Sequence, residues 1–220
     1  MQRQIFDAGY LRRLTTPGTY RAAGPGRFSA LHFTAHALAN RESPLDSAVL
    51  LAVRWVHDSI RLTRALGTRV LLLPFFGKWA LQTRQEMDYT GDALRELAPE
   101  AEKADVILGL EDTNSAEDNV RILDRARSSN VQVYYDVGNS TNGGFDVLKE
   151  IRWLGKDRIC QIHLKHNPNY LGEGKIQFAP IMAAIREIGF RGYAVLETDS
   201  KSPATLEADM RRNLAYIRGL

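Results

Sequence analysis

The chain has 220 residues, 44% hydrophobic and 25% charged, a composition that excludes disordered, collagen-like and coiled-coil proteins. No apolar stretch approaches the roughly 18 residues of a transmembrane helix, and the single cysteine, Cys160, excludes an intrachain disulfide framework or a cysteine-rich zinc module. The net charge of the chain is +3, but the excess positive charge lies in residues 1–27, which carry five arginines and one aspartate. The net charge of residues 28–220 is −1, so charge gives no support for nucleic-acid binding.

Six short apolar segments predict β-strands. They are nearly continuous hydrophobic runs and do not alternate with polar residues, which is typical of a parallel sheet covered on both faces. In chain order the predicted strands are Phe28–Thr34, Arg69–Phe76, Val106–Glu111, Val131–Val137, Ile159–Lys165 and Tyr193–Thr198.

Longer segments with helical periodicity follow these strands. Alternation of strands with helices predicts parallel βα units joined by right-handed crossovers. The predicted helices are Ala48–Leu66, Tyr89–Ala104, Ala116–Arg127, Phe145–Leu154, Ala179–Ile188 and Thr205–Leu220.

The fold class predicted from these units is an α/β TIM-type barrel, forming one domain over residues 1–220. A closed (β/α) barrel has eight units, whereas about six are clear here, so we expect a shortened or atypical N-terminal side. Residues 1–27 contain one candidate helix, Gln4–Leu14, and no good strand. They lack the apolar core of a secretory signal, and we expect a cytoplasmic protein.

Four consecutive predicted strands end in side chains that bind metals. They are Glu111, Asp136, His163 and Glu197, separated by 25, 27 and 34 residues, each about one βα unit. Functional residues of α/β barrels lie at the C-terminal ends of the strands. Three carboxylates and one imidazole suit a hard or borderline divalent ion such as Mn²⁺, Mg²⁺ or Co²⁺, and are less specific for zinc.

Motifs along most of the chain resemble those of the xylose isomerase-like TIM barrels, specifically the sugar phosphate isomerase/epimerase family. The resemblance extends over residues 28–203, and its specificity comes from the order and spacing of the motifs. The segments are Ser29–His36, Leu71–Lys78, Leu110–Asn119, Tyr134–Ser140, Gln161–Asn167, Tyr170–Phe178 and Val195–Asp199.

The resemblance implies that Glu111, Asp136, His163 and Glu197 hold one divalent metal ion. We expect Mn²⁺, with Mg²⁺, Co²⁺ or Zn²⁺ as alternatives, and a small sugar-like substrate that chelates the ion through a carbonyl and an adjacent hydroxyl. Glu111 and Glu197 would then perform acid–base catalysis, removing and returning a proton α to the carbonyl through an enediolate. With one glutamate on each side, return of the proton to the opposite face of the same carbon gives epimerisation, and return to a neighbouring carbon gives isomerisation.

Six further residues are candidates for substrate binding. Asn139 stands where the family often has histidine, and Lys165 precedes His166, which replaces an acid of the family motif; these departures leave the substrate open. The remaining candidates are Lys78 near a strand end, Glu117, which is also explained as an acid in the first turn of a helix, Glu173 in a glycine-flanked loop, and His32 in the first strand.

Three alternatives remain open from the sequence. A metal-dependent lyase of the inosose dehydratase type shares the enolate-forming step and loses water afterwards. A non-catalytic, incomplete barrel would expose sheet edges that favour pairing with another chain, and for the same reason a homodimer is expected. An endonuclease IV-type nuclease is disfavoured because it needs a trinuclear zinc cluster, while this chain has five histidines and Asn139 where a further metal-binding histidine would stand.

Overall fold

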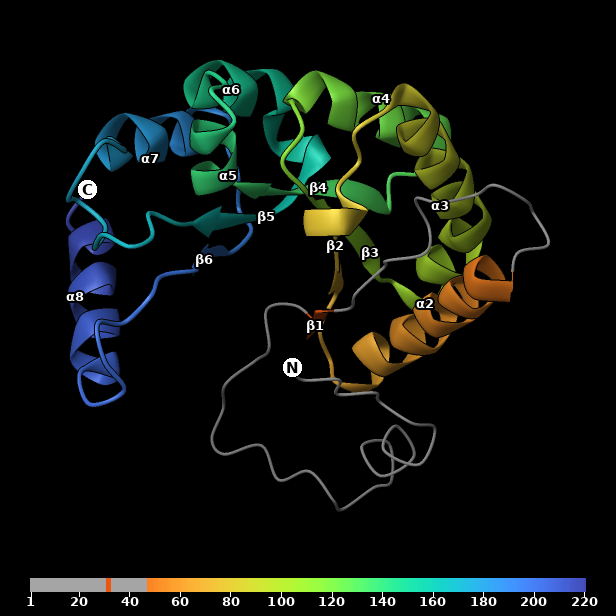
Figure 1. Ribbon diagram of the computed structural model, residues 1–220, viewed down its shortest axis with the longest axis horizontal. Helices are drawn as coiled ribbons and strands as arrows, with labels where there is room; N and C mark the ends of the chain where they lie inside the picture. Colours follow the sequence, from red (N-terminus) through yellow and green to blue (C-terminus); the bar gives the residue numbers. More distant parts are fainter. Residues whose placement is uncertain (1–30, 33–46) are drawn as a thin grey trace.

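The computed structural model describes residues 31–32 and 47–220, so the predicted helix Gln4–Leu14 and most of the predicted strand Phe28–Thr34 lie outside the described residues. Within the described residues, six parallel strands form one sheet in which each strand pairs with the next along the chain (Figure 1). The strands are β1 (Leu31–His32), β2 (Val70–Pro74), β3 (Ile107–Glu111), β4 (Val131–Asp136), β5 (Ile159–Leu164) and β6 (Ala194–Leu196).

Helices connect the strands and lie along the convex side of the curled sheet (Figure 1). This arrangement confirms the predicted α/β architecture of a TIM-type barrel, with β1 and β6 as the sheet edges within the described residues. No helix among residues 47–220 has the length and apolar character needed to cross a membrane. The helices are α2 (Ser47–Ala65), α3 (Arg84–Ala104), α4 (Ala116–Ala126), α5 (Val137–Asn142), α6 (Val147–Arg158), α7 (Phe178–Glu187) and α8 (Leu206–Arg218), with a 3₁₀ turn, η1, at Gly77–Trp79.

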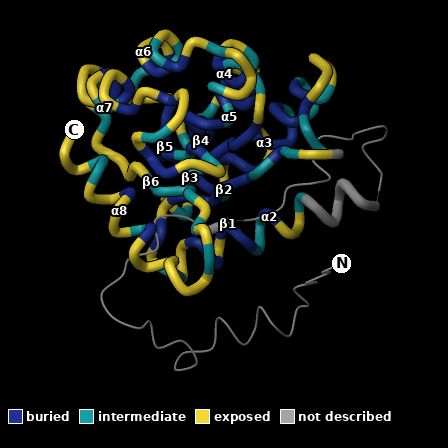
Figure 2. The backbone as a smooth tube through the Cα atoms, turned by 60° about the vertical axis from the view of Figure 1, so that its left-hand side comes forward, coloured by how far each residue is buried: buried dark blue, intermediate teal, exposed yellow. Residues whose placement is uncertain are grey.

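The inner strands β2, β3, β4 and β5 have apolar contacts on both faces, which explains their continuous hydrophobic sequences. In β2, Leu71 and Leu73 belong to the large cluster that packs the sheet against the helices, whereas Val70 and Leu72 belong to a smaller cluster on the other face. Successive side chains of a strand point to opposite faces, so the smaller cluster fills the concave side. Figure 2 shows strands β2 to β5 largely buried behind helices whose outer surfaces are exposed.

The concave side is tightly packed around Gly109 of β3. A Cβ at this position would lie 2.9 Å from the Cys160 sulfur and 3.4 Å from the Tyr134 ring. Glycine is therefore needed for space, since interiors are close-packed and a further methyl group would force its neighbours to move. Cys160 is a buried packing residue, and burial raises the pKa of its thiol to about 12.

One helix start and one additional helix differ from the predictions for local reasons. Helix α3 begins at Arg84, earlier than predicted, because Thr83 and Glu86 form a capping box in which each side chain binds the other residue's backbone N–H. The short helix α5 was not predicted. It begins directly after β4 because the Asp136 side chain caps it, accepting a hydrogen bond from the Asn139 backbone N–H at 2.8 Å.

A carboxylate on α6 joins several of these elements. Glu150 accepts hydrogen bonds from the Ala116 backbone N–H at 2.8 Å, from the Tyr135 hydroxyl at 2.9 Å and from the Ser140 hydroxyl at 2.6 Å. These contacts fix the start of α4, the end of β4 and helix α5 relative to α6. They therefore hold in place the ends of β3 and β4, where the candidate ligands lie.

Candidate metal centre

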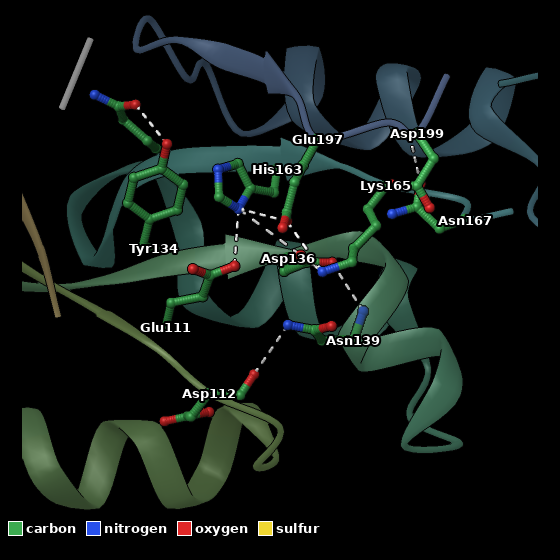
Figure 3. A network of polar contacts seen from close by, with 11 residues as sticks. Glu111, Asp112, Tyr134, Asp136, Asn139, His163, Lys165, Asn167, Glu197 and Asp199 are labelled. Atoms are coloured by element: carbon green, nitrogen blue, oxygen red, sulfur yellow. Dashed lines mark hydrogen bonds and ion pairs between the residues drawn. The ribbon is translucent and has the colours of Figure 1, made fainter. Parts of the chain in front are cut away.

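The structure gathers four potential metal ligands at the C-terminal edge of the sheet. Glu111 ends β3, Asp136 ends β4, His163 lies near the end of β5, and Glu197 follows β6. One ligand atom from each residue lies within 4.8 Å of every other. Figure 3 shows the three carboxylates converging on the imidazole of His163. Parallel register produces this convergence, since Asp136 pairs with His163 and His163 with Val195, two residues before Glu197.

The imidazole is at the centre of the cluster. Its Nδ1 lies 2.8 Å from Glu111 Oε1, 3.0 Å from Glu197 Oε2 and 3.8 Å from Asp136 Oδ2. The side chains of Glu111, Asp136 and His163 are at most 5% exposed, whereas that of Glu197 is 41% exposed. The cluster is therefore closed on the side of β3 and β4 and accessible beside Glu197.

The pKa values of the cluster are shifted because three carboxylates surround one imidazole. Burial lowers the pKa of His163, but hydrogen bonds to Glu111 and Glu197 outweigh it and raise the pKa to about 9. Burial and the neighbouring Glu197 carboxylate raise the pKa of Asp136. The pKa of Glu197 is lowered: burial opposes this, and hydrogen bonds to His163 and other neighbours cause it. In the metal-free protein, His163 is therefore protonated, and its positive charge lies among the carboxylates, where a metal cation would also be stabilised.

Two of the predicted substrate-binding residues lie beside the cluster. Lys165 Nζ is 3.1 Å from Glu197 Oε2 and 3.5 Å from Asp136 Oδ2. Burial lowers the pKa of Lys165, but the carboxylates of Asp136 and Glu197 outweigh it, so the pKa is raised. Asn139, in the first turn of α5, directs its amide nitrogen toward the backbone oxygen of Asp112 at 3.5 Å (Figure 3).

The other four candidates are not brought to the cluster by described contacts. Glu117 is exposed in the first turn of α4, behind Ser115, which caps that helix, and lines a groove between α3 and α4. Glu173 forms an ion pair with Arg212 of α8. His32 lies in β1 and Lys78 in η1, and their side chains are outside the described part of the chain.

Sequence reasoning missed two residues around the cluster. Asp112 follows Glu111 and is buried; burial raises its pKa to about 6, against hydrogen bonds from the Asn114 backbone N–H and the Asn119 side chain. The Tyr134 ring lies 4.4 Å from the imidazole of His163 and forms part of its wall. Two consecutive acids at the end of β3, Glu111 and Asp112, could have indicated Asp112 from the sequence. The sequence does not distinguish Tyr134 from a residue that only packs in the core.

The donor set fits a divalent cation. It offers three carboxylates and one imidazole within a space where their ligand atoms are all neighbours. Asp136 Oδ2 is buried and accepts no hydrogen bond from the described residues, although it lies 3.5 Å from the charged Lys165 Nζ, so this ligand atom keeps hydrogen-bonding capacity that an ion could use. Buried carboxylates are costly unless they are paired or bind a metal, and oxygen-rich sites with one imidazole suit Mn²⁺, Mg²⁺ and related ions.

Comparisons with known proteins agree with this fold. The family model for xylose isomerase-like TIM barrels matches residues 26–220. D-psicose 3-epimerase of Enterocloster bolteae is 26% identical over 74% of this chain, which spans only 59% of that relative's length. A protein of Escherichia coli K12 provisionally named L-ribulose-5-phosphate 3-epimerase SgbU is 31% identical over 82% of this chain and 71% of its own length. A solved sugar phosphate isomerase/epimerase from Parabacteroides distasonis has a TM-score of 0.69 and 16% identity, covering 86% of this chain and 70% of that one.

Proposed function

Because the chain belongs to the xylose isomerase-like TIM barrel family, we propose that it is a divalent-metal-dependent epimerase of a sugar or sugar-like ketose. Three relatives are named as sugar 3-epimerases, one of them provisionally, which supports epimerisation at the carbon beside the carbonyl. The observation that carries the proposal is the convergence of four ligand atoms, from the ends of four neighbouring strands, within 4.8 Å.

Glu111, Asp136, His163 and Glu197 would hold the ion. When bound, the ion would supply Lewis acidity, polarising the carbonyl and stabilising the negative charge of an enediolate. For the ion we propose Mn²⁺, because three carboxylates and one imidazole provide the hard ligands it prefers. The same donors also accommodate Mg²⁺, Co²⁺ or Zn²⁺.

Glu111 and Glu197 would move the proton. They come from β3 and β6, on either side of the strands that carry Asp136 and His163, and both contact the same imidazole nitrogen. Their environments differ, since Glu111 is buried and Glu197 is 41% exposed, with a lowered pKa and a lysine at 3.1 Å. An ionised Glu197 can accept a proton from one face of the carbon while the other glutamate serves the opposite face.

Deuterium exchange tests this proposal directly. The metal-loaded protein is incubated in D₂O with D-psicose, L-ribulose and L-ribulose 5-phosphate, and the sugars are analysed by NMR. We expect deuterium at C3 and appearance of the C3 epimer for at least one of them. Glu111→Gln and Glu197→Gln should each slow exchange by about 10²–10⁴-fold.

Asp157→Asn, a matched loss of one carboxylate on the exposed surface of α6, should leave the exchange rate unchanged. Metal-loaded protein that exchanges none of the three sugars would contradict the proposed epimerase. Release of water from the substrate without an epimer would instead assign the lyase alternative. A homodimer remains part of the proposal, and the mass of the protein in solution tests it.

A further inference from the structure

A second hollow lies beside the ligand cluster, on the same edge of the sheet. Its volume is about 160 Å³, and it is bounded by helix α5 and by the loop between β5 and α7. The cluster and the hollow share Lys165, whose Nζ lies 3.1 Å from Glu197. The lining residues are Gly138, Asn142, Lys165, His166, Asn167, Asn169, Lys175 and Ile176.

The lining is polar and cationic. Two lysines, three asparagine amides and one histidine provide hydrogen-bond donors, and none of the described lining residues is a carboxylate. Asn167 Oδ1 already accepts a hydrogen bond from the Asp199 backbone N–H at 3.0 Å, which leaves its NH₂ group as the free part of the amide. The nearby acid Glu173 is engaged by Arg212.

His166 is the most buried polar side chain among the lining residues. The residue is 5% exposed, and its Nδ1 has no hydrogen-bond partner among the described residues. Burial and the charge of Lys175 lower the pKa of His166. A buried polar atom without a partner is costly, and such an atom in the wall of a hollow indicates a ligand or water that satisfies it.

Gly174 allows the loop to close over this histidine. Its φ of +75° is readily adopted by glycine, and a Cβ there would lie 2.7 Å from His166 Cε1 and 3.1 Å from Asn169 Nδ2. Gly138 has the corresponding role on α5, where an added Cβ would lie 3.0 Å from the Lys165 stem. Both glycines thus allow the backbone to pack closely against the groups that line the hollow.

Lys175 supplies the uncompensated charge. It is exposed at the edge of the hollow and forms no ion pair with any residue that the structure describes, whereas Lys165 is shared with the carboxylates of Asp136 and Glu197. A hollow with a free cation and converging amide donors matches an anion with several acceptor oxygens.

We propose that this hollow binds the phosphate group of a phosphorylated sugar, while the sugar's carbonyl end lies at the four-residue cluster. This inference rests on the proposed epimerase function and specifies its substrate class. Lys165 connects the two parts of the site, since it contacts Glu197 while lining the hollow. The hollow would then hold the phosphate at one end of a short ketose, and the neighbouring four-residue cluster would hold the carbonyl near its other end.

Binding to the metal-free protein tests the hollow independently of catalysis. Chelator treatment is needed because inorganic phosphate also binds divalent ions. Inorganic phosphate is titrated into wild type, Lys175→Gln and the control Lys156→Gln, and the imidazole resonances of His166 are followed by NMR. We expect saturable shifts of His166 and a dissociation constant that rises about tenfold in Lys175→Gln only.

Acetate and an unphosphorylated ketose serve as further probes in the same titration. Saturation by acetate or by the free ketose, with no response to phosphate, would overturn the assignment in favour of a carboxylate or a hydroxyl. An equal loss of phosphate binding in both lysine variants would also overturn it, because that would indicate diffuse surface charge.

A kinetic measurement separates this inference from the proposed function. The ratio of kcat/KM for a ketose 5-phosphate to that for the free ketose should favour the phosphate ester in wild type and fall about tenfold in Lys175→Gln. Turnover with no preference for the ester would refute the phosphate site and leave the epimerase proposal intact. Lys175-dependent phosphate binding without turnover of any sugar would contradict the epimerase and leave the anion site intact.

Discussion

Protons and the metal ion should compete for one atom, Nδ1 of His163. In the metal-free protein this nitrogen is directed at Glu111 and Glu197, at 2.8 and 3.0 Å, and the resulting hydrogen bonds raise the histidine's pKa to about 9. A metal ion needs the neutral imidazole, so binding must release that proton. Lowering the pH is therefore the perturbation that most directly probes the proposed centre.

The size of the effect follows from the pKa of His163. Below pH 9 the protonated form predominates, and each further pH unit lowers metal affinity by about tenfold. Between pH 8 and pH 6 the affinity should fall by about a hundredfold, equivalent to about 2.7 kcal/mol. The raised pKa of Asp136 acts in the same direction, because a protonated carboxyl group is a poor ligand.

Calorimetric titration with Mn²⁺ measures both quantities. Titrations at pH 6, 7 and 8 give the affinities, and repetition in buffers of different ionisation enthalpy gives the number of protons released. We expect about one proton per ion from His163 at pH 7. His57→Gln, which alters a histidine paired with Glu100 between α2 and α3, is the control and should leave the profile unchanged. An affinity that does not vary from pH 6 to 8, with no proton release, would refute the reasoning.

Three further outcomes are expected. In the metal-free protein, folding raises the pKa of His163 from 6.5 to about 9, so the free energy of unfolding should fall as the pH rises through this range. Urea titrations should show this fall in wild type and should not show it in His163→Gln. Gly138→Ala should lower stability by about 1–3 kcal/mol, because the added Cβ would lie 3.0 Å from Lys165. Gly219→Ala, whose nearest contact would be at 3.4 Å, should not lower it, and equal urea midpoints for the two variants would contradict this. Glu150→Ala should lower stability by about 1–3 kcal/mol because the Ala116 N–H and the Ser140 hydroxyl lose their acceptor, while the Tyr135 hydroxyl keeps Ser140 Oγ as an acceptor at 3.0 Å; an unchanged melting temperature would contradict that role.

The order of the strands and the positions of their ends could be predicted from the sequence. Runs such as Val131–Val137 are hydrophobic on both faces, and they terminate where a charged residue cannot remain buried without a partner. In a parallel sheet such ends share one edge. The spacing of Glu111, Asp136 and His163 by about one βα unit therefore predicts that their side chains lie together at that edge.

Other features depend on tertiary contacts that a sequence pattern does not contain. Helix α5 has six residues, too few for helical periodicity to emerge, and its start depends on the Asp136 side chain. The ion pair of Glu173 with Arg212 joins a loop to a helix 39 residues away. The hollow beside the cluster forms because the loop after β5 folds back over His166, which sequence reasoning noted only as a departure from a family motif.

Metal content is the measurement that tests the proposed centre most directly. Wild type, Glu197→Gln and the surface control Asp157→Asn are purified, loaded with Mn²⁺, dialysed and analysed for bound metal, and their melting temperatures are recorded with and without the ion. We predict about one ion per chain and a Mn²⁺-dependent rise in melting temperature for wild type and Asp157→Asn, with both lost in Glu197→Gln. Wild-type protein that neither retains an ion nor gains stability with Mn²⁺, Mg²⁺, Co²⁺ or Zn²⁺ would contradict the account.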